Sequence, residues 1–215
     1  MEDYLKIIYK LSETKGKVTT NAISERLGIS QASVTGMLKK LSELKLIRYT
    51  PYYGVELSQA GKKIALEVIR HHRLLELYLA EALGFTWDKV HEEAERLEHV
   101  ISEEFEEKMA EFLGHPSTDP HGAPIPSKDG AIEKRSLIPL SKIEAGNRVE
   151  IKQVSDRDPE MLRYLGKIGI YPEVVIDVLE KVPFGGSLLV QVGKNKHYLG
   201  EGLTNNIFVE PIKSN

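Results

Sequence analysis

The chain has 215 residues, enough for one large domain or two to three small ones, and its 41% hydrophobic and 28% charged residues describe an ordinary soluble globular protein. It contains no cysteine, which excludes disulfides, thiolate metal sites and thiol catalysis. No stretch approaches the roughly 20 apolar residues of a membrane span, and the acidic N-terminus is unlike a signal peptide, so we expect a cytoplasmic protein.

The net charge of −3 is unevenly distributed along the chain. Residues 1–65 carry a net charge of +5, residues 66–128 carry −8, and residues 129–215 carry none. A basic segment beside an acidic one favours two partners of opposite sign, a polyanion for the first and a cation for the second. Chance combined with solubility is the alternative explanation.

The first quarter of the chain has the pattern of a winged helix-turn-helix. We expect elements over residues 3–13, 18–28, 31–44 and 47–57. Thr19 or Thr20 can cap the second helix and Gly28 can end it, which leaves the short turn that a helix-turn-helix requires. The last element is predicted to be a hairpin, the wing, with its tip at residues 51–54.

The helix over residues 31–44 has the features of a recognition helix. Hydroxyl and amide side chains at its start can reach base edges or phosphates, and lysines one or two turns later can neutralise the DNA backbone. The predicted DNA contacts are Ser30, Gln31, Ser33, Thr35, Lys39, Lys40 and, on the wing, Arg48. A winged helix can also be a protein-interaction domain, but the basic charge in the same segment favours double-stranded DNA.

Two long amphipathic helices are expected in the acidic segment, over residues 59–83 and about 86–113, each followed by a glycine. The first helix carries several leucines, among them Leu74, Leu75 and Leu79. Because a helix-turn-helix usually acts as a dimer, we expect these helices to form the homodimer module.

The second of these helices gathers potential metal ligands, namely His91, Glu95, Glu98 and His99. They stand at i, i+4, i+7 and i+8, which places all of them on one face of a helix and offers lone pairs to a divalent cation. His72 and Glu76 share a face of the preceding helix, and Asp3 begins the first helix. Each patch taken alone also fits a solvated helix face, or an acid favoured by the helix dipole.

Beyond the acidic segment, the apolar residues no longer follow the helical spacing and indicate a loop followed by short strands. Residues 114–130 are rich in proline, glycine and polar residues and form the expected domain boundary. Short strands are then expected over residues 148–151, 174–178, 187–192 and 207–209, with one helix over 159–165. Together they predict a small β-barrel.

These features together resemble the diphtheria toxin repressor family of metal-dependent transcriptional repressors, which includes iron-dependent regulators and manganese transport regulators. The resemblance rests on the winged helix, the histidine–glutamate motifs at 72–76 and 91–99, the loop from His121 to Pro126 and the barrel. It implies an α+β multidomain fold. The implied parts are a winged helix-turn-helix at 1–65, a helical metal-binding and dimerisation domain at 66–128, a linker at 129–142 and a C-terminal SH3-like (FeoA-type) domain at 143–215.

The resemblance also implies two metal sites. The primary site corresponds to Asp3, Glu95, Glu98 and His99, and the ancillary site to His72, Glu76 and His91, to which the barrel can add Gln153 and Asp156. Iron-responsive members have sulfur ligands at two primary positions, where this chain has Asp3 and Glu95. Carboxylates suit hard ions, so Mn²⁺ is the expected corepressor, Fe²⁺ the alternative, and Co²⁺, Ni²⁺ or Zn²⁺ surrogates. Lys6 stands where barrel-less manganese regulators have a glutamate ligand, so their closely spaced two-metal site is not expected.

The sequence therefore predicts a repressor, not an enzyme, that binds operator DNA as a metal-loaded homodimer and controls metal homeostasis genes, without a membrane or small-molecule substrate as partner. A metal-independent winged-helix regulator is one alternative. A carboxylate-bridged di-metal enzyme is another, but it needs a Glu-x-x-His motif on two helices, and this chain has Glu95-x-x-Glu98-His99 once. A third is a barrel that binds a proline-rich segment.

Overall fold

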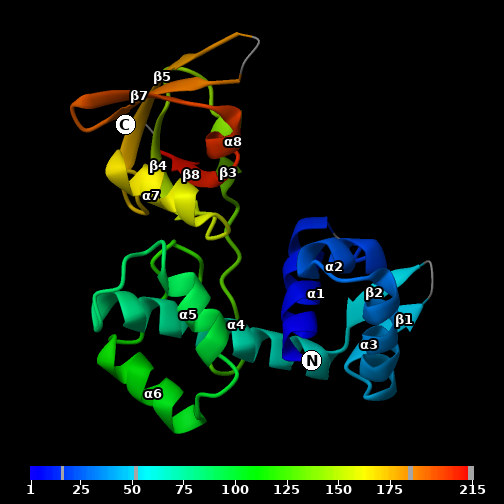
Figure 1. Cartoon of the computed structure of the whole chain (residues 1–215). Helices are drawn as coiled ribbons and strands as arrows, with labels where there is room; N and C mark the ends of the chain where they lie inside the picture. The colour runs from blue at the N-terminus through cyan, green and yellow to red at the C-terminus, as the bar shows by residue number, and fades with distance from the viewer. Residues whose placement is uncertain (16, 51–52, 184–185, 213–215) are drawn as a thin grey trace. The chain divides into compact units, whose positions relative to one another are not determined.

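The computed structural model describes residues 1–15, 17–50, 53–183 and 186–212 (Figure 1). The chain divides into two units. The first contains residues 1–71, 98–100 and 126–131, and the second contains residues 72–97, 101–125 and 132–215. Within the described ranges, no helix is both long enough and apolar enough to cross a membrane.

The first unit contains the predicted winged helix-turn-helix. Its elements are α1 (Glu2–Lys15), α2 (Thr20–Leu27), α3 (Gln31–Glu43), β1 (Ile47–Thr50), β2 (Gly54–Leu57) and the first half of α4 (Gln59–Glu81). Thr19 caps α2 by accepting the N–H of Ala22, and Gly28 ends it in the left-handed conformation at φ +66°. Ser30 then caps α3 by accepting the N–H of Ser33. These two caps set the turn between the helices.

The core of this unit comes from the apolar faces of its helices. Its fully buried side chains include Leu5, Ile8, Ile23, Val34, Leu38 and Leu41. The wing is an antiparallel pair in which Ile47 stands opposite Leu57. Residues 51 and 52 of the predicted wing tip lie outside the described residues.

The helical part of the second unit corrects one expectation. The single helix predicted over residues 86–113 is wrong, because the chain forms α5 (Val90–Leu97) and α6 (Glu103–Phe112). Residues 98–102 separate them. Ser102 caps α6, with an extended backbone at φ −85° and ψ 158° and a side chain that accepts the N–H of Phe105. A serine that can cap a new helix competes with continuation of the old one. Glu98 and His99 therefore follow the end of α5 instead of sharing its face.

The barrel contains one sheet with the strand order β3-β8-β4-β5-β6-β7, in which every pairing is antiparallel. Its strands are β3 (Ile138–Pro139), β4 (Arg148–Val154), β5 (Val175–Lys181), β6 (Leu188–Val192), β7 (Asn195–Leu199) and β8 (Ile207–Pro211). A short 3-10 turn, η1 (Leu140–Lys142), and the helices α7 (Pro159–Lys167) and α8 (Glu201–Thr204) complete it. The predicted α+β multidomain fold class is confirmed (Figure 1).

Candidate metal centres

The first candidate centre lies in the second unit, where α4 supplies His72 and Glu76 and α5 supplies His91. The Nε2 atom of His72 lies 3.0 Å from Oε1 of Glu76 and 3.0 Å from Nδ1 of His91. Nδ1 of His91 lies 3.0 Å from the same Glu76 oxygen. Three ligand atoms from three side chains thus form a triangle with equal edges. We call His72, Glu76 and His91 the ancillary triad.

The geometry of the ancillary triad fits a metal ion. Ligands at right angles around an ion at about 2.1 Å are about 3.0 Å apart, which is the edge of this triangle. The side chains of His72 and Glu76 are 2% and 0% exposed, and that of His91 is 25% exposed. The triad is therefore anchored in the protein and open on the His91 side.

The barrel brings one predicted ligand to this centre. Oδ2 of Asp156, in the segment between β4 and α7, lies 3.6 Å from Nδ1 of His91. Among the described residues, His72, Glu76, His91 and Asp156 form one group with metal-ligand spacing. Gln153 lies on β4 opposite Phe208 of β8, and its role as a ligand stays a prediction.

Glu95 also lies beside this centre. Its Oε1 atom is 4.0 Å from Nδ1 of His72 and 3.9 Å from Nε2 of His91, and its side chain is 42% exposed. The other three predicted primary ligands belong to the first unit, whereas Glu95 belongs to the second. Its assignment to the primary site stays a prediction.

The second candidate centre lies in the first unit, where Asp3 on α1 meets Glu98 and His99. Nε2 of His99 lies 2.7 Å from Oδ1 of Asp3 and 3.4 Å from Oε1 of Glu98. The other ring nitrogen of His99, Nδ1, lies 2.6 Å from Oε2 of Glu2, a residue that the sequence analysis did not single out. We call Asp3, Glu98 and His99 the primary triad.

Carboxylates surround the His99 ring. Burial by itself would lower the pKa of His99, but the hydrogen bond to Glu2 and the charges of Asp3 and Glu98 raise it above its ordinary value of 6.5. A divalent ion at Nε2 has to displace the proton that these carboxylates stabilise.

A buried lysine contacts the primary triad. Nζ of Lys6 lies 2.8 Å from Oε1 and 2.7 Å from Oε2 of Glu98. Nδ1 of His71 lies 3.1 Å from the backbone oxygen of Glu98, so His71 faces this segment and not the ancillary triad. Oxygen and nitrogen donors, without sulfur, make up both centres.

Glu76 has a second set of neighbours behind the ancillary triad. Asp119 and His121, from the loop after α6, are buried and form a ligand-spaced group with Glu76. Burial alone would raise the pKa of Glu76, but the charge of His72 and the imidazoles of His121 and His91 hold it well below its usual range. Glu76 is therefore an anion. The sequence does not predict Asp119 and His121 as neighbours of Glu76, because their proximity to it depends on the fold.

The predicted DNA-contacting side chains lie on α3 and the wing. Ser30, Gln31, Ser33, Lys39, Lys40 and Arg48 are exposed, and Thr35 is half-buried. Two of them have partners within the unit: Gln31 donates to Oδ1 of Asn21 at 2.8 Å, and Arg48 pairs with Glu56 at 2.9 Å. The face carries hydroxyl, amide and ammonium groups.

The helical part of the second unit exposes large apolar side chains. They are Leu83, Phe85, Phe105 and Phe112. Tyr78 contacts Phe105 and Phe112 edge-on, with ring centroids 6.3 and 5.6 Å apart. Phe105 and Phe112, connected through Tyr78, thus form an exposed apolar patch that suits an interface with another chain.

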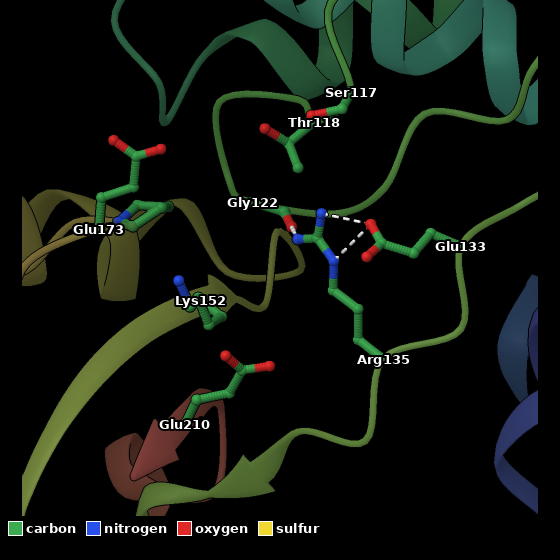
Figure 2. A pocket seen from close by; sticks show the side chains of 9 residues that line it. Ser117, Thr118, Gly122, Glu133, Arg135, Lys152, Glu173 and Glu210 are labelled. Carbon is green, nitrogen blue, oxygen red and sulfur yellow. Dashed lines mark hydrogen bonds and ion pairs between the residues drawn. The ribbon is translucent and has the colours of Figure 1, made fainter. Parts of the chain in front are cut away.

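A cavity of about 270 Å³ lies between the barrel and the loop after α6, lined by Ser117, Thr118, Gly122, Glu133, Arg135, Lys152, Pro172, Glu173 and Glu210 (Figure 2). Arg135 donates to Oε2 of Glu133 at 2.8 and 2.6 Å and to the backbone oxygen of Gly122 at 3.4 Å. Because charges of both signs line it and the arginine is already paired, the cavity favours no single ligand charge.

Family models match three consecutive segments. Residues 1–55 match the iron-dependent repressor N-terminal DNA-binding domain, and residues 58–127 match the iron-dependent repressor metal-binding and dimerisation domain. Residues 138–211 match the FeoA domain.

Whole proteins and solved structures are also similar. The iron-dependent repressor IdeR of Mycobacterium tuberculosis is 30% identical over 223 residues, which cover 98% of this chain and 96% of that protein. A solved manganese-dependent transcriptional repressor in complex with manganese is 36% identical, with a TM-score of 0.92 over 98% of this chain and 99% of that one. The structure of ScaR with bound Zn²⁺ is 31% identical, with a TM-score of 0.83 over 98% of this chain and 99% of that one.

Proposed function

The chain belongs to the family of metal-dependent transcriptional repressors that its motifs predicted, and on that premise we propose that Mn²⁺ is its corepressor. In this proposal the metal-loaded protein binds operator DNA as a homodimer in the cytoplasm and controls genes of metal homeostasis. Fe²⁺ is the second candidate ion. Family membership also supports a regulator and not the di-metal enzyme considered from the sequence.

The observation that carries the proposal is the ancillary triad. Ligand atoms of His72, Glu76 and His91 lie 3.0 Å from one another, and two of the three side chains are fully buried. Imidazoles at such short mutual distances beside a buried carboxylate suit a shared cation. Asp156 is positioned to add a further oxygen ligand.

The choice of Mn²⁺ rests on the donor chemistry. The primary triad offers two carboxylates and one imidazole, and the chain has no cysteine to supply a thiolate. Carboxylate oxygens suit hard ions such as Mn²⁺, whereas sulfur donors favour softer ions. The similarity to a manganese-dependent repressor supports the same ion.

The primary triad provides the proposed link between metal and DNA. Asp3 belongs to α1, which packs against α2 and the wing strand β2, while Glu98 and His99 directly follow α5. A bound ion supplies positive charge that offsets repulsion between the Asp3 and Glu98 carboxylates. The ligands then hold α1 against the segment 98–100, which fixes the DNA-binding elements in one arrangement. Moving a two-state population from 1:99 to 99:1 in this way needs about 5.5 kcal/mol of differential binding.

The DNA-binding and dimer surfaces are assigned from their chemistry. Ser30, Gln31, Ser33, Thr35, Lys39, Lys40 and Arg48 are proposed to contact DNA, and the patch around Phe105 and Phe112 is proposed to be the dimer interface. Recognition helices of such dimers enter major grooves about one duplex turn apart.

The test is DNA binding across a series of metals. A duplex selected from a random pool with the Mn²⁺-loaded protein serves as the probe, and its affinity is measured by anisotropy with Mn²⁺, Fe²⁺, Co²⁺, Zn²⁺ and chelator. We expect binding with Mn²⁺ and loss of binding with chelator. Binding that survives chelation would show a metal-independent regulator, and a clear preference for Fe²⁺ would replace Mn²⁺ in the proposal.

A further inference from the structure

The carboxylate of Glu76 faces two different environments. Oε1 belongs to the ancillary triad, 3.0 Å from His72 and from His91. Oε2 points the other way, toward Nδ1 of His121 at 3.7 Å. Within the described part of the chain, both of these facing atoms are buried without a hydrogen-bond partner. A buried polar atom without a partner is costly, so this pair calls for an explanation.

The ring of His121 is held in a fixed orientation. Its Nε2 lies 2.7 Å from the backbone oxygen of Trp87, a pure acceptor, so Nε2 carries the hydrogen that this bond needs. The Trp87 ring stacks on the imidazole with centroids 5.8 Å apart and planes 23° apart. Nδ1 is therefore directed at Glu76 by contacts on the opposite side of the ring.

Asp119 favours a proton over a metal ion between these atoms. Its Oδ1 already accepts the backbone N–H groups of His121 and Ala123 at 2.9 and 3.0 Å. Its Oδ2 lies 3.5 Å from Nε of Arg73. An additional divalent cation here would meet the guanidinium charge and an aspartate whose oxygens are occupied. A proton on Nδ1 needs only a closer approach of about half an ångström to become a hydrogen bond to Glu76.

We propose that His121 is a positioning residue of the ancillary site, which holds Oε2 of Glu76 so that Oε1 alone faces the metal. The inference rests on the proposed function, because it assigns His72, Glu76 and His91 to a metal. Groups that orient metal ligands from behind typically change metal affinity by about 10- to 100-fold when they are removed.

The backbone of the same loop holds the barrel strand that leads to Asp156. The oxygen of His121 accepts the N–H of Val154 at 2.9 Å, two residues before Asp156. At Gly122, with φ +85°, an added Cβ would lie 2.0 Å from the backbone oxygen of Lys152, so the loop lies directly against β4. Arg135 supports the loop through the Gly122 oxygen (Figure 2). One loop thus positions Glu76 through a side chain and Asp156 through the backbone.

Two isosteric substitutions separate the two ring nitrogens. The amide of asparagine can replace the Nδ1 donor, so His121→Asn keeps a donor that faces Glu76 and loses the bond to Trp87. The amide of glutamine reaches the Nε2 position, so His121→Gln keeps the bond to Trp87 and loses the donor that faces Glu76. His197→Phe on β7 is the control. It removes a histidine of the same unit, and His197 belongs to none of the ligand groups found among the described residues.

The measurement is a Mn²⁺ titration of the full chain by calorimetry, with thermal melting of each metal-free variant to verify folding. We expect His121→Gln to weaken one class of site by about 10- to 100-fold, and His121→Asn and His197→Phe to remain close to the wild type. Wild-type affinity in His121→Gln, or the reverse order of the two isosteres, would overturn the inference. If His121→Gln loses one more bound ion than Glu76→Gln does, His121 would belong to a third cation site, and the proposed positioning role would be wrong. A wild-type chain that binds no Mn²⁺ would contradict the proposed function itself.

Discussion

The ammonium nitrogen of Lys6 lies 2.8 and 2.7 Å from the two carboxylate oxygens of Glu98, and the two side chains are 4% and 0% exposed. A buried carboxylate of this kind needs a compensating charge. Lys6 supplies this positive charge in the absence of metal. The carboxylate that it contacts is the one that Glu98 contributes to the primary triad. In the proposed function, the metal ion and Lys6 therefore use the same carboxylate, that of Glu98.

Lys6→Met tests this sharing. It leaves Glu98 buried without its cation, so we expect the metal-free protein to lose about 3 to 5 kcal/mol of unfolding free energy. Mn²⁺ should restore part of this loss, because the ion replaces the missing charge. Urea unfolding with and without Mn²⁺ measures both effects. Lys39→Met, an exposed change on α3, is the control, and equal Mn²⁺ stabilisation of wild type and Lys6→Met would contradict the shared-site argument.

Glu95→Cys tests the hardness argument. A thiolate in place of the carboxylate should shift metal preference from Mn²⁺ toward softer ions such as Zn²⁺. Competition titrations give the ratio of the two affinities. Glu92→Cys adds the same thiol to an exposed position of α5 and should leave the ratio unchanged. An unchanged ratio in Glu95→Cys would mean that residue 95 does not determine the choice of metal.

Local signals explain what the sequence predicts correctly. The caps at Thr19 and Ser30 and the turn at Gly28 are short-range features, so the helix-turn-helix follows from them directly. The ligand stripe at 91–99 is predicted as one helix face because Ser102 is taken as part of a continuous helix, although serine also caps helices.

The unpredicted parts depend on tertiary contacts or weak patterns. Glu2 contacts His99 across 97 residues of sequence, and His121 faces Glu76 across 45 residues. No local sequence pattern encodes contacts over such separations. The sequence does not predict strand β7 (Asn195–Leu199), because this segment is mostly polar and exposed and lacks the alternation that identifies a strand. Family resemblance alone assigns Asp156 to the ancillary site. Its Oδ2 lies 3.6 Å from Nδ1 of His91, and its role as a ligand stays a prediction.

His99→Gln tests the electrostatics of the primary triad in the metal-free protein. The folded-state pKa of His99 is raised above 6.5, so its protonated form contributes stability that is fully present below 6.5 and is lost as pH rises through the raised value. The substitution should therefore cost more stability in acid than in alkali. Urea unfolding of both proteins across this range measures the difference. A difference that is independent of pH would mean that Glu2 and Asp3 do not stabilise the imidazolium.

Lys39→Ala and Lys40→Ala test the recognition helix. Both lysines are exposed on α3 and are assigned to phosphates. Each substitution should weaken binding to all duplexes to a similar degree and reduce the salt dependence of the affinity by about one counterion. Lys167→Ala, at the end of α7 in the barrel, is the control. A loss confined to one DNA sequence would instead assign the lysine to a base.

The link between metal and DNA makes a reciprocal prediction. If the primary triad fixes the DNA-binding elements only when loaded, then Mn²⁺ must tighten DNA binding and the selected duplex must tighten Mn²⁺ binding by the same factor. Coupling of this kind typically amounts to about 1 to 3 kcal/mol, or roughly 5- to 150-fold. Two titrations measure it, Mn²⁺ into the protein with and without duplex, and duplex into the protein with Mn²⁺ and with chelator. Asp3→Asn keeps the size of the side chain and removes a charged ligand of the triad, so it should reduce both factors together. Glu76→Gln alters the other centre, and a comparison of the two variants assigns the coupling to one centre. Equal Mn²⁺ affinity with and without duplex would show that the metal does not act through the arrangement of the DNA-binding elements.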